Sequence, residues 1–100
     1  RAEARTQEVA QGFLAAASHA ASADLAHLPG FEQITLYPAV PMVVQRVANV
    51  ERAQMLIESP SRVALQGFLA AWHGVLHTVR QSEASRGLLR WAVDVDPLAI

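Results

Sequence analysis

The sequence SPSRVALQGFLAAWHGVLHTVR at residues 59–80 carries a strong helical pattern. Its apolar side chains recur at spacings of three and four, which draws one stripe along a helix; they are Leu65, Phe68, Leu69, Trp72, Val75, Leu76 and Val79. Ser59 before Pro60 favours a start with Ser59 as N-cap and Pro60 in the first helical position, and Ser61 is the competing cap. The stretch therefore predicts a one-faced helix whose stripe packs against another element.

The next apolar segment, LLRWAVDVDP at residues 88–97, has the period of a strand. The polar run before it ends at Gly87, which suits a turn. Alternation places Leu89, Trp91, Val93 and Val95 on one face and Arg90, Ala92, Asp94 and Asp96 on the other. Pro97 ends the strand because proline cannot donate to a ladder.

The first part of the chain predicts a helix between two short extended segments. Arg1–Ala4 has the pattern of a strand stub, and Thr6–Ala23 predicts a helix with Phe13 and a flat alanine surface that suits close packing on a sheet. Residues 25–28 could add a further helical turn before a turn at Pro29-Gly30.

A strand and a hairpin are predicted in the middle. Ile34–Tyr37 is a short strand that Pro38 and Pro41 confine to an edge or an interrupted course. Two arms, Met42–Val47 and Val50–Glu58, then flank Ala48-Asn49 as a hairpin connection. Alternation on the second arm puts Ala53, Met55 and Ile57 on one face.

The order of these elements predicts an α+β fold. It is the order of a ferredoxin-like split βαβ plait, with two helices on one face of a mostly antiparallel sheet of three or four strands. If most of the first strand is missing, one sheet position would be empty or filled by a neighbouring chain.

Composition places the 100 residues in one soluble domain, residues 1–100. Hydrophobic residues make up 52% and charged residues 17%, which excludes a disordered tail, and no run is long enough to span a membrane. The absence of cysteine excludes disulfides and thiolate-bound metal and is compatible with the cytoplasm. The start at Arg1 without methionine or a signal region indicates a piece of a longer protein.

Residues Ser59-Pro60-Ser61-Arg62-Val63, a following helix, and Leu89-Arg90-Trp91-Ala92-Val93-Asp94-Val95-Asp96-Pro97 carry a family resemblance. In this order, and close to a C-terminus, they resemble the C-terminal domain of the PriA family of bacterial replication-restart helicases, also called primosomal protein N′. The resemblance is clearest over Glu51–Pro97, while residues 6–50 fit by length and pattern. The family's domain is known for a fold similar to a small-subunit ribosomal protein.

The resemblance implies a non-catalytic module of a larger motor. The parent helicases are ATP-dependent, translocate 3′ to 5′, use Mg²⁺ and carry cysteine-bound zinc, but the motifs for these activities lie outside this chain, and no cofactor is expected in this domain. The implied partners are single-stranded or fork DNA, the C-terminal tail of single-stranded DNA-binding protein, the helicase core of the same chain and other primosome proteins. No membrane partner is implied.

Four arginines are the candidate binding residues. Arg62 lies in the first turn of the main helix, where its guanidinium and the backbone N–H groups can converge on an anion; the resemblance makes it the candidate for the carboxylate of the partner tail, against the simpler interpretation of a surface arginine. Arg46, Arg52 and Arg90 are candidates for DNA phosphates, since arginine near an aromatic residue suits single strands. The alternation of Trp91 favours a core position for that indole.

Two further pairs have plainer interpretations. His73 and His77 have the spacing of zinc ligands on a helix but lack a third ligand nearby, so surface or structural histidines are favoured and no metal site is predicted. Asp94 and Asp96 share a strand face and could hold Mg²⁺, but a solvated face paired to arginines is favoured.

No catalytic motif is present: phosphate loops, nucleophile elbows and zinc-protease motifs are all missing. Two other functions remain open. One is a purely structural domain that packs on the helicase core, and the other is a small ligand-binding domain, which would need a deep pocket lined by histidines.

Overall fold

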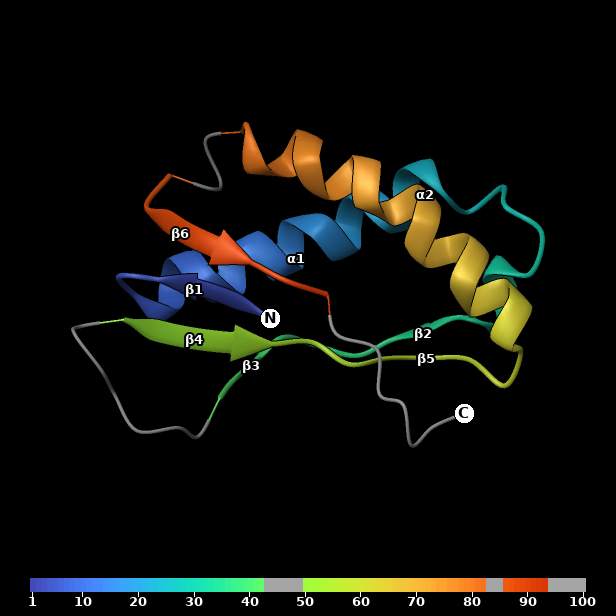
Figure 1. The fold of residues 1–100 in the computed structure, drawn as a ribbon, viewed down its shortest axis with the longest axis horizontal. Helices are drawn as coiled ribbons and strands as arrows, with labels where there is room; N and C mark the ends of the chain where they lie inside the picture. The colour runs from blue at the N-terminus through green and yellow to red at the C-terminus, as the bar shows by residue number, and fades with distance from the viewer. Residues whose placement is uncertain (43–49, 83–85, 94–100) are drawn as a thin grey trace.

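The computed structural model of the protein describes residues 1–42, 50–82 and 86–93. In chain order its elements are β1 (Ala2–Ala4), α1 (Gln7–Asp24), a 3₁₀ turn η1 (Phe31–Gln33), β2 (Thr35–Leu36), β3 (Val40–Pro41), β4 (Glu51–Gln54), β5 (Ile57–Glu58), α2 (Arg62–Arg80) and β6 (Leu88–Trp91). Figure 1 shows the two helices with the strands of the sheet. The predicted α+β class is confirmed.

The strands form a four-stranded sheet in the order β3-β4-β1-β6 and a separate two-stranded sheet of β2 and β5. All pairings among the described strands are antiparallel. Strand β1 lies in the centre, where Ala2 pairs with Ala53 on one side and Trp91 on the other. The sheet position that the sequence left in doubt is therefore filled by β1.

The pairings define the crossovers. Because β4 is antiparallel to both β1 and β3, those two strands run parallel with β4 between them, and β4 and β6 run parallel around β1. Helix α1 makes the first crossover and α2 the second. Split βαβ units of this kind are an element of the ferredoxin-like plait, which remains a prediction here because β2 and β5 form a second sheet.

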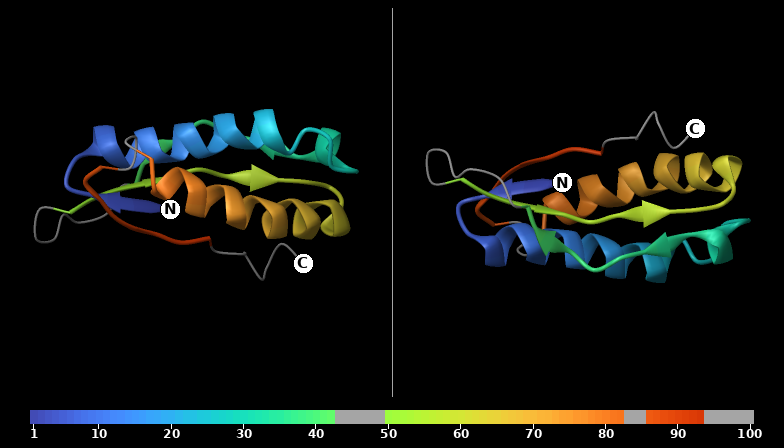
Figure 2. Two further views of the ribbon diagram at one scale, coloured as in Figure 1. Left: turned by 90° about the horizontal axis from the view of Figure 1, so that it is seen from above. Right: turned by 90° about the horizontal axis from the view of Figure 1, so that it is seen from below.

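The two helices differ in their relation to the sheet. Helix α1 contacts β1, β3, β4 and β6, and in Figure 1 it passes behind the strands. Helix α2 packs mainly on α1 and η1, and Figure 1 shows it above the strands rather than across them. The two views of Figure 2 likewise place α1 on one side of the strands. Of the two helices predicted on one face of the sheet, α1 packs across the strands. Helix α2 instead reaches the sheet through the edge strand β6, where Arg80 Nη2 donates to the Leu88 carbonyl at 3.0 Å.

The core is built from alanines under α1 and aromatic rings under α2. Ala2, Ala4 and Ala53 of the sheet and Ala10 and Ala17 of α1 have no exposed surface, as expected for the close approach that a small-residue surface allows. On α2, Phe68 stacks with Trp72 at a centroid distance of 5.6 Å and meets Phe31 of η1 at 5.9 Å. The apolar stripe predicted from the sequence faces the core: four of its residues are buried, and they are Phe68, Trp72, Leu76 and Val79.

The helix caps decide which residues begin each helix. Thr6, predicted as the first helical residue, is the N-cap of α1 and accepts from the Val9 N–H at 3.2 Å. Ser61 caps α2 and accepts from the Ala64 N–H at 3.1 Å, so the prediction of Ser59 as cap is wrong and the competing cap is correct. The Ser59 hydroxyl instead accepts from the Ser61 N–H at 3.0 Å, which holds the true cap in place.

The segment after α1 turns twice. Residues 25–28 form a single turn closed by the Leu28 N–H and the Leu25 carbonyl at 3.0 Å, not a further turn of α-helix. Gly30 has φ +84°, and a Cβ there would lie 2.8 Å from the Ala64 side chain. A residue without a side chain is needed for this left-handed turn beside α2.

The hairpin is longer and more broken than predicted. Its first arm runs through β2 and β3 and its second through β4 and β5, and the Tyr37 N–H joins them by donating to the Leu56 carbonyl at 3.0 Å. Pro38 lies in the interruption between β2 and β3, which confirms the predicted interrupted course, whereas Pro41 belongs to the edge strand β3 and pairs with Ala53. The paired first arm begins upstream of Met42, and the Ala48-Asn49 connection lies outside the described residues.

The last strand departs from the predicted alternation. A register shift opposite Glu3 and Ala4 makes Leu88 the partner of Ala4 and Arg90 the partner of Glu3. Leu88 is therefore buried, while Leu89, expected on the core face, is 43% exposed. Strand β6 ends at Trp91, and the predicted continuation from Asp94 to Pro97 lies outside the described residues.

Candidate functional site

An apolar groove of about 1370 Å³ lies along α2. The second hairpin arm contributes Met55 and Ile57 to its lining, and α1 contributes Phe13. From α2 itself come apolar side chains and two polar ones: Leu65, Leu69, Trp72 and Leu76 with Arg62 and Gln66. A groove lined mainly by apolar side chains with a few polar ones suits a ligand that has apolar side chains, such as an extended peptide.

Arg62 is the first residue of α2 and is exposed at this groove. No acidic residue lies in the first turn of the helix, and Ser61 caps only the Ala64 N–H. The first backbone N–H groups of a helix have no partner within the helix, and they favour anions together with the helix dipole. Arg62 therefore lies at the N-terminus of α2, beside apolar surface that the sequence did not locate, and the convergence of its guanidinium and the backbone N–H groups on an anion stays a prediction.

We call the sheet face opposite α1 the outer face. Three charged residues, Glu3, Arg52 and Arg90, form a row across it, the Glu3 row. Ala2, Ala4 and Ala53 are buried on the side of α1, so their neighbours Glu3 and Arg52 alternate to the outer face. Glu3 stands between Arg52 of β4 and Arg90 of β6, its direct partners in the sheet. Arg90 Nε donates to Glu3 Oε2 at 2.9 Å, and Arg52 Nε lies 3.5 Å from Oε1.

The two arginines lower the pKa of the Glu3 carboxyl below its ordinary value of 4.5, and the hydrogen bond from Arg90 is the largest cause. The charged form of Glu3 thus stabilises the folded state. That stability is present above the ordinary pKa and is lost as the pH falls through the lowered one.

We expect Glu3→Gln to reduce the free energy of unfolding at neutral pH by about 1 kcal/mol, because Arg90 is largely exposed and solvent screens the pair. The difference between the two proteins should shrink as the pH falls from 4.5 through the lowered pKa of Glu3, where the carboxyl of the folded wild-type protein becomes protonated. Urea unfolding of both proteins over that pH range measures it. A difference that stays constant at all pH values would contradict the electrostatic origin.

Sequence reasoning did not single out Glu3. A lone glutamate in an Ala-Glu-Ala segment has no special pattern. Its role depends on the register that places it between Arg52 and Arg90, and the two arginines are 38 residues apart in the chain. The role of Glu3 could have been predicted only if Arg1–Ala4 had been recognised as a central strand of the sheet.

The remaining DNA candidates are only partly described. Arg52 and Arg90 lie on the outer face, on the two strands that flank β1. Arg46 is outside the described residues. Trp91 is half-buried and stacks on Phe13 at a centroid distance of 6.4 Å, which agrees with the predicted core position. Arg90 has 70% of its side chain exposed.

His73 and His77 pack on Trp91. Their rings are 5.4 Å apart, and each meets the indole edge-on, at 5.3 Å for His73 and 5.4 Å for His77. Within residues 1–42, 50–82 and 86–93, no group of three or more possible metal ligands occurs. Asp94 and Asp96 lie outside these ranges.

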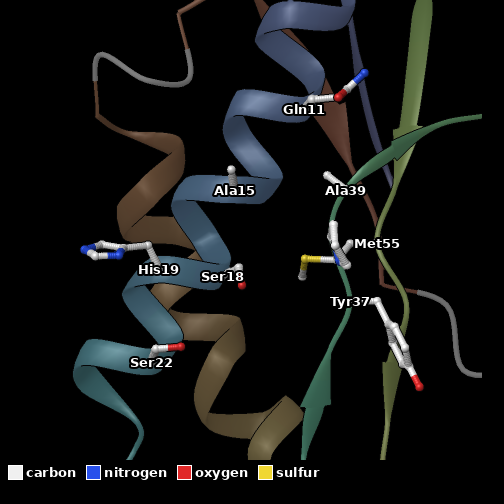
Figure 3. A pocket seen from close by; sticks show the side chains of 9 residues that line it. Gln11, Ala15, Ser18, His19, Ser22, Tyr37, Ala39 and Met55 are labelled. Atoms are coloured by element: carbon white, nitrogen blue, oxygen red, sulfur yellow. The ribbon is translucent and has the colours of Figure 1, made fainter.

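A second, shallow pocket of about 490 Å³ lies between α1 and the first hairpin arm (Figure 3). His19 and Tyr37 line it, but their side chains point away from each other in Figure 3. Tyr37 donates its hydroxyl proton to Glu58 at 2.8 Å, and this bond raises the pKa of Tyr37. The histidine-lined pocket that a small-ligand function would need is not formed by the described residues.

No helix in the described part of the chain is long and apolar enough to cross a membrane.

Comparison with known families identifies the domain. A model of the primosomal protein N (PriA) C-terminal domain matches residues 1–98, and no solved structure matches the chain. The match covers nearly the whole sequence and includes every element described above. The chain therefore belongs to the PriA C-terminal domain family and is part of a replication-restart helicase of the primosome.

Proposed function

We propose that this domain docks the acidic C-terminal tail of single-stranded DNA-binding protein and helps to bind branched or single-stranded DNA, without catalysing a reaction itself. The parent helicase would supply ATP hydrolysis, Mg²⁺ and zinc binding from other domains. In a bacterial cell this places the domain in the cytoplasm, beside the helicase core and other primosome proteins.

The observation that carries the proposal is the position of Arg62. A terminal carboxylate can accept charge-assisted hydrogen bonds from a guanidinium fork while the first-turn N–H groups face the same anion. The apolar groove beside it, lined by Leu65 and Leu69, suits the apolar side chains of an extended tail. Gln66, one helical turn further along, adds an amide to the same lining.

The DNA part of the proposal is supported by the outer face. Arg52 and Arg90 bring two guanidinium groups to the four-stranded sheet, and Arg46 lies between β3 and β4 in the sequence, outside the described residues. Phosphate contacts by arginine are tolerant of sequence, which suits forks of any sequence. The net charge of −1 means that binding depends on these local charges rather than on overall attraction.

We expect charge reversal of Arg46, Arg52 and Arg90 together to weaken binding of the domain to single-stranded and fork DNA by at least about tenfold at low salt. Fluorescence anisotropy with labelled DNA at low and moderate salt measures it. When each of the three arginines is reversed singly, Arg62→Glu is the control, because it changes the net charge by the same amount at another surface. Absence of binding at low salt by the unaltered domain would overturn an autonomous DNA role.

The rival proposal is a purely structural domain that packs on the helicase core. It predicts that Arg62→Glu and Arg90→Glu leave tail and DNA binding by the full helicase unchanged, while core substitutions such as Trp72→Ala cost about 3–5 kcal/mol of stability. Its support is the Glu3 row, since ion pairs across a sheet also occur without any ligand. Anisotropy with labelled DNA and with a labelled tail peptide, measured on the full helicase, therefore decides between the two proposals.

A further inference from the structure

We propose that Glu3 is a positioning residue that joins Arg52 and Arg90 into one phosphodiester-binding site on the outer face. The inference rests on the proposed DNA function and goes beyond it. Instead of separate positive charges, it assigns one composite site with a buried carboxylate at its centre.

The atoms in contact support a shared site. Both arginines approach Glu3 through Nε, Arg52 at Oε1 and Arg90 at Oε2, so one carboxylate bridges two guanidinium groups. Because both contacts with Glu3 are made through Nε, the proposal assigns the terminal Nη amines to the ligand. Planar guanidinium groups recognise phosphate through such paired N–H donors.

Burial separates the roles of the three residues. The Glu3 side chain is only 9% exposed, whereas Arg90 is 70% exposed and Arg52 is 28% exposed. The carboxylate is thus less accessible than the two arginine side chains, and a ligand would meet the arginines first. An arginine held at Nε has already lost part of the rotamer freedom that binding would otherwise remove.

The charge of the row matches one phosphodiester. Two guanidinium groups and one carboxylate leave a local charge of +1, which a single phosphodiester of charge −1 neutralises. Without Glu3, the two cations would repel each other and move apart in solvent. The proposal therefore predicts that removing the negative charge of Glu3 weakens DNA binding, whereas simple electrostatic attraction predicts that it strengthens binding.

The first test is Glu3→Gln, measured by anisotropy with a labelled single strand over a range of salt. We expect affinity to fall about three- to tenfold, and the slope of log K against log salt to decrease by about 0.7 for each phosphate that the variant no longer neutralises. Glu8→Gln is the matched control: it removes the same charge from the exposed surface of α1 and should leave affinity unchanged or slightly raised. Thermal unfolding of each variant establishes that the domain is folded.

The second test, Arg90→Lys, remains informative if Glu3→Gln does not fold. Lysine keeps the charge, but its single ammonium lacks the planar fork that contacts Glu3 and a phosphate through different nitrogens. We expect a similar three- to tenfold loss for this exposed position. Retained affinity in Arg90→Lys, or equal or tighter binding by folded Glu3→Gln, would overturn the positioning role.

These outcomes are distinct from failure of the proposed function. If the unaltered domain binds DNA and Arg52→Glu and Arg90→Glu abolish binding, but Glu3→Gln does not weaken it, only the role of Glu3 is wrong. If the arginine reversals have no effect on DNA binding, the DNA function of the outer face fails as well.

Discussion

Replacement of Trp72 by alanine is expected to lower the free energy of unfolding by about 3–5 kcal/mol. The indole is only 3% exposed and stacks on Phe68 at 5.6 Å. Its Nε1 donates to the Ala17 carbonyl of α1 at 3.0 Å. The substitution thus removes a large buried surface and a hydrogen bond at the point where the two helices meet.

Urea unfolding followed by far-ultraviolet circular dichroism measures the loss. Val63→Ala is the control, because Val63 lies on the same helix with 81% of its surface exposed, and it should change stability by no more than about 0.5 kcal/mol. Since a loss of this size can approach the whole stability of a small domain, Trp72→Phe provides a milder variant that keeps a ring and removes the hydrogen bond. Unfolding energies within about 1 kcal/mol of wild type for Trp72→Ala would contradict the packing of α2 on α1.

The contrast between the two helices and the sheet shows what a single sequence can predict. Helix α2 follows from a local repeat, because residues three and four apart share a face wherever the helix lies. Its cap was harder, since Ser59 and Ser61 both fit the cap chemistry. The choice depends on the Ser59 hydroxyl accepting from the Ser61 N–H, a contact that the order of residue types does not reveal.

The sheet depends on pairing between distant segments. Strict alternation put Leu89 on the core face of β6, but the register shift opposite Glu3 buries Leu88 instead. A register shift of one residue reverses the faces of the side chains that follow. For the same reason, Arg90 could be recognised as a candidate cation, but its partner Glu3 could not.

The candidate sites likewise combine local features, which a sequence can predict, with features that arise only in the folded chain. Arg62 was predictable because a helix start and its first side chain are local features. The groove beside it was not, because α2, the second hairpin arm and Phe13 of α1 come together only in the folded chain. The sequence therefore indicated the charge that an anion would meet, while the structure adds the apolar surface that could hold the rest of a peptide.

Arg62→Glu is accordingly expected to weaken binding of an acidic peptide with a free terminal carboxylate by about 1.5–3 kcal/mol, or roughly tenfold to a hundredfold. The substitution removes a charge-assisted hydrogen-bond donor and places a carboxylate at the first position of α2, where it repels the tail. Anisotropy of a labelled peptide with the sequence of that tail measures the loss, in the full helicase and in this domain. Arg90→Glu, with the same change in net charge on the outer face, is the matched control and should leave peptide affinity nearly unchanged.

Amidation of the peptide identifies the group that Arg62 binds. If the terminal carboxylate contacts the guanidinium, amidation should cost the wild-type protein about as much affinity as Arg62→Glu does, and should cost the variant much less. Equal losses from amidation in both proteins would show that Arg62 acts on other charges of the tail. An unchanged affinity of the full helicase after Arg62→Glu would remove the groove from tail recognition and favour the purely structural domain.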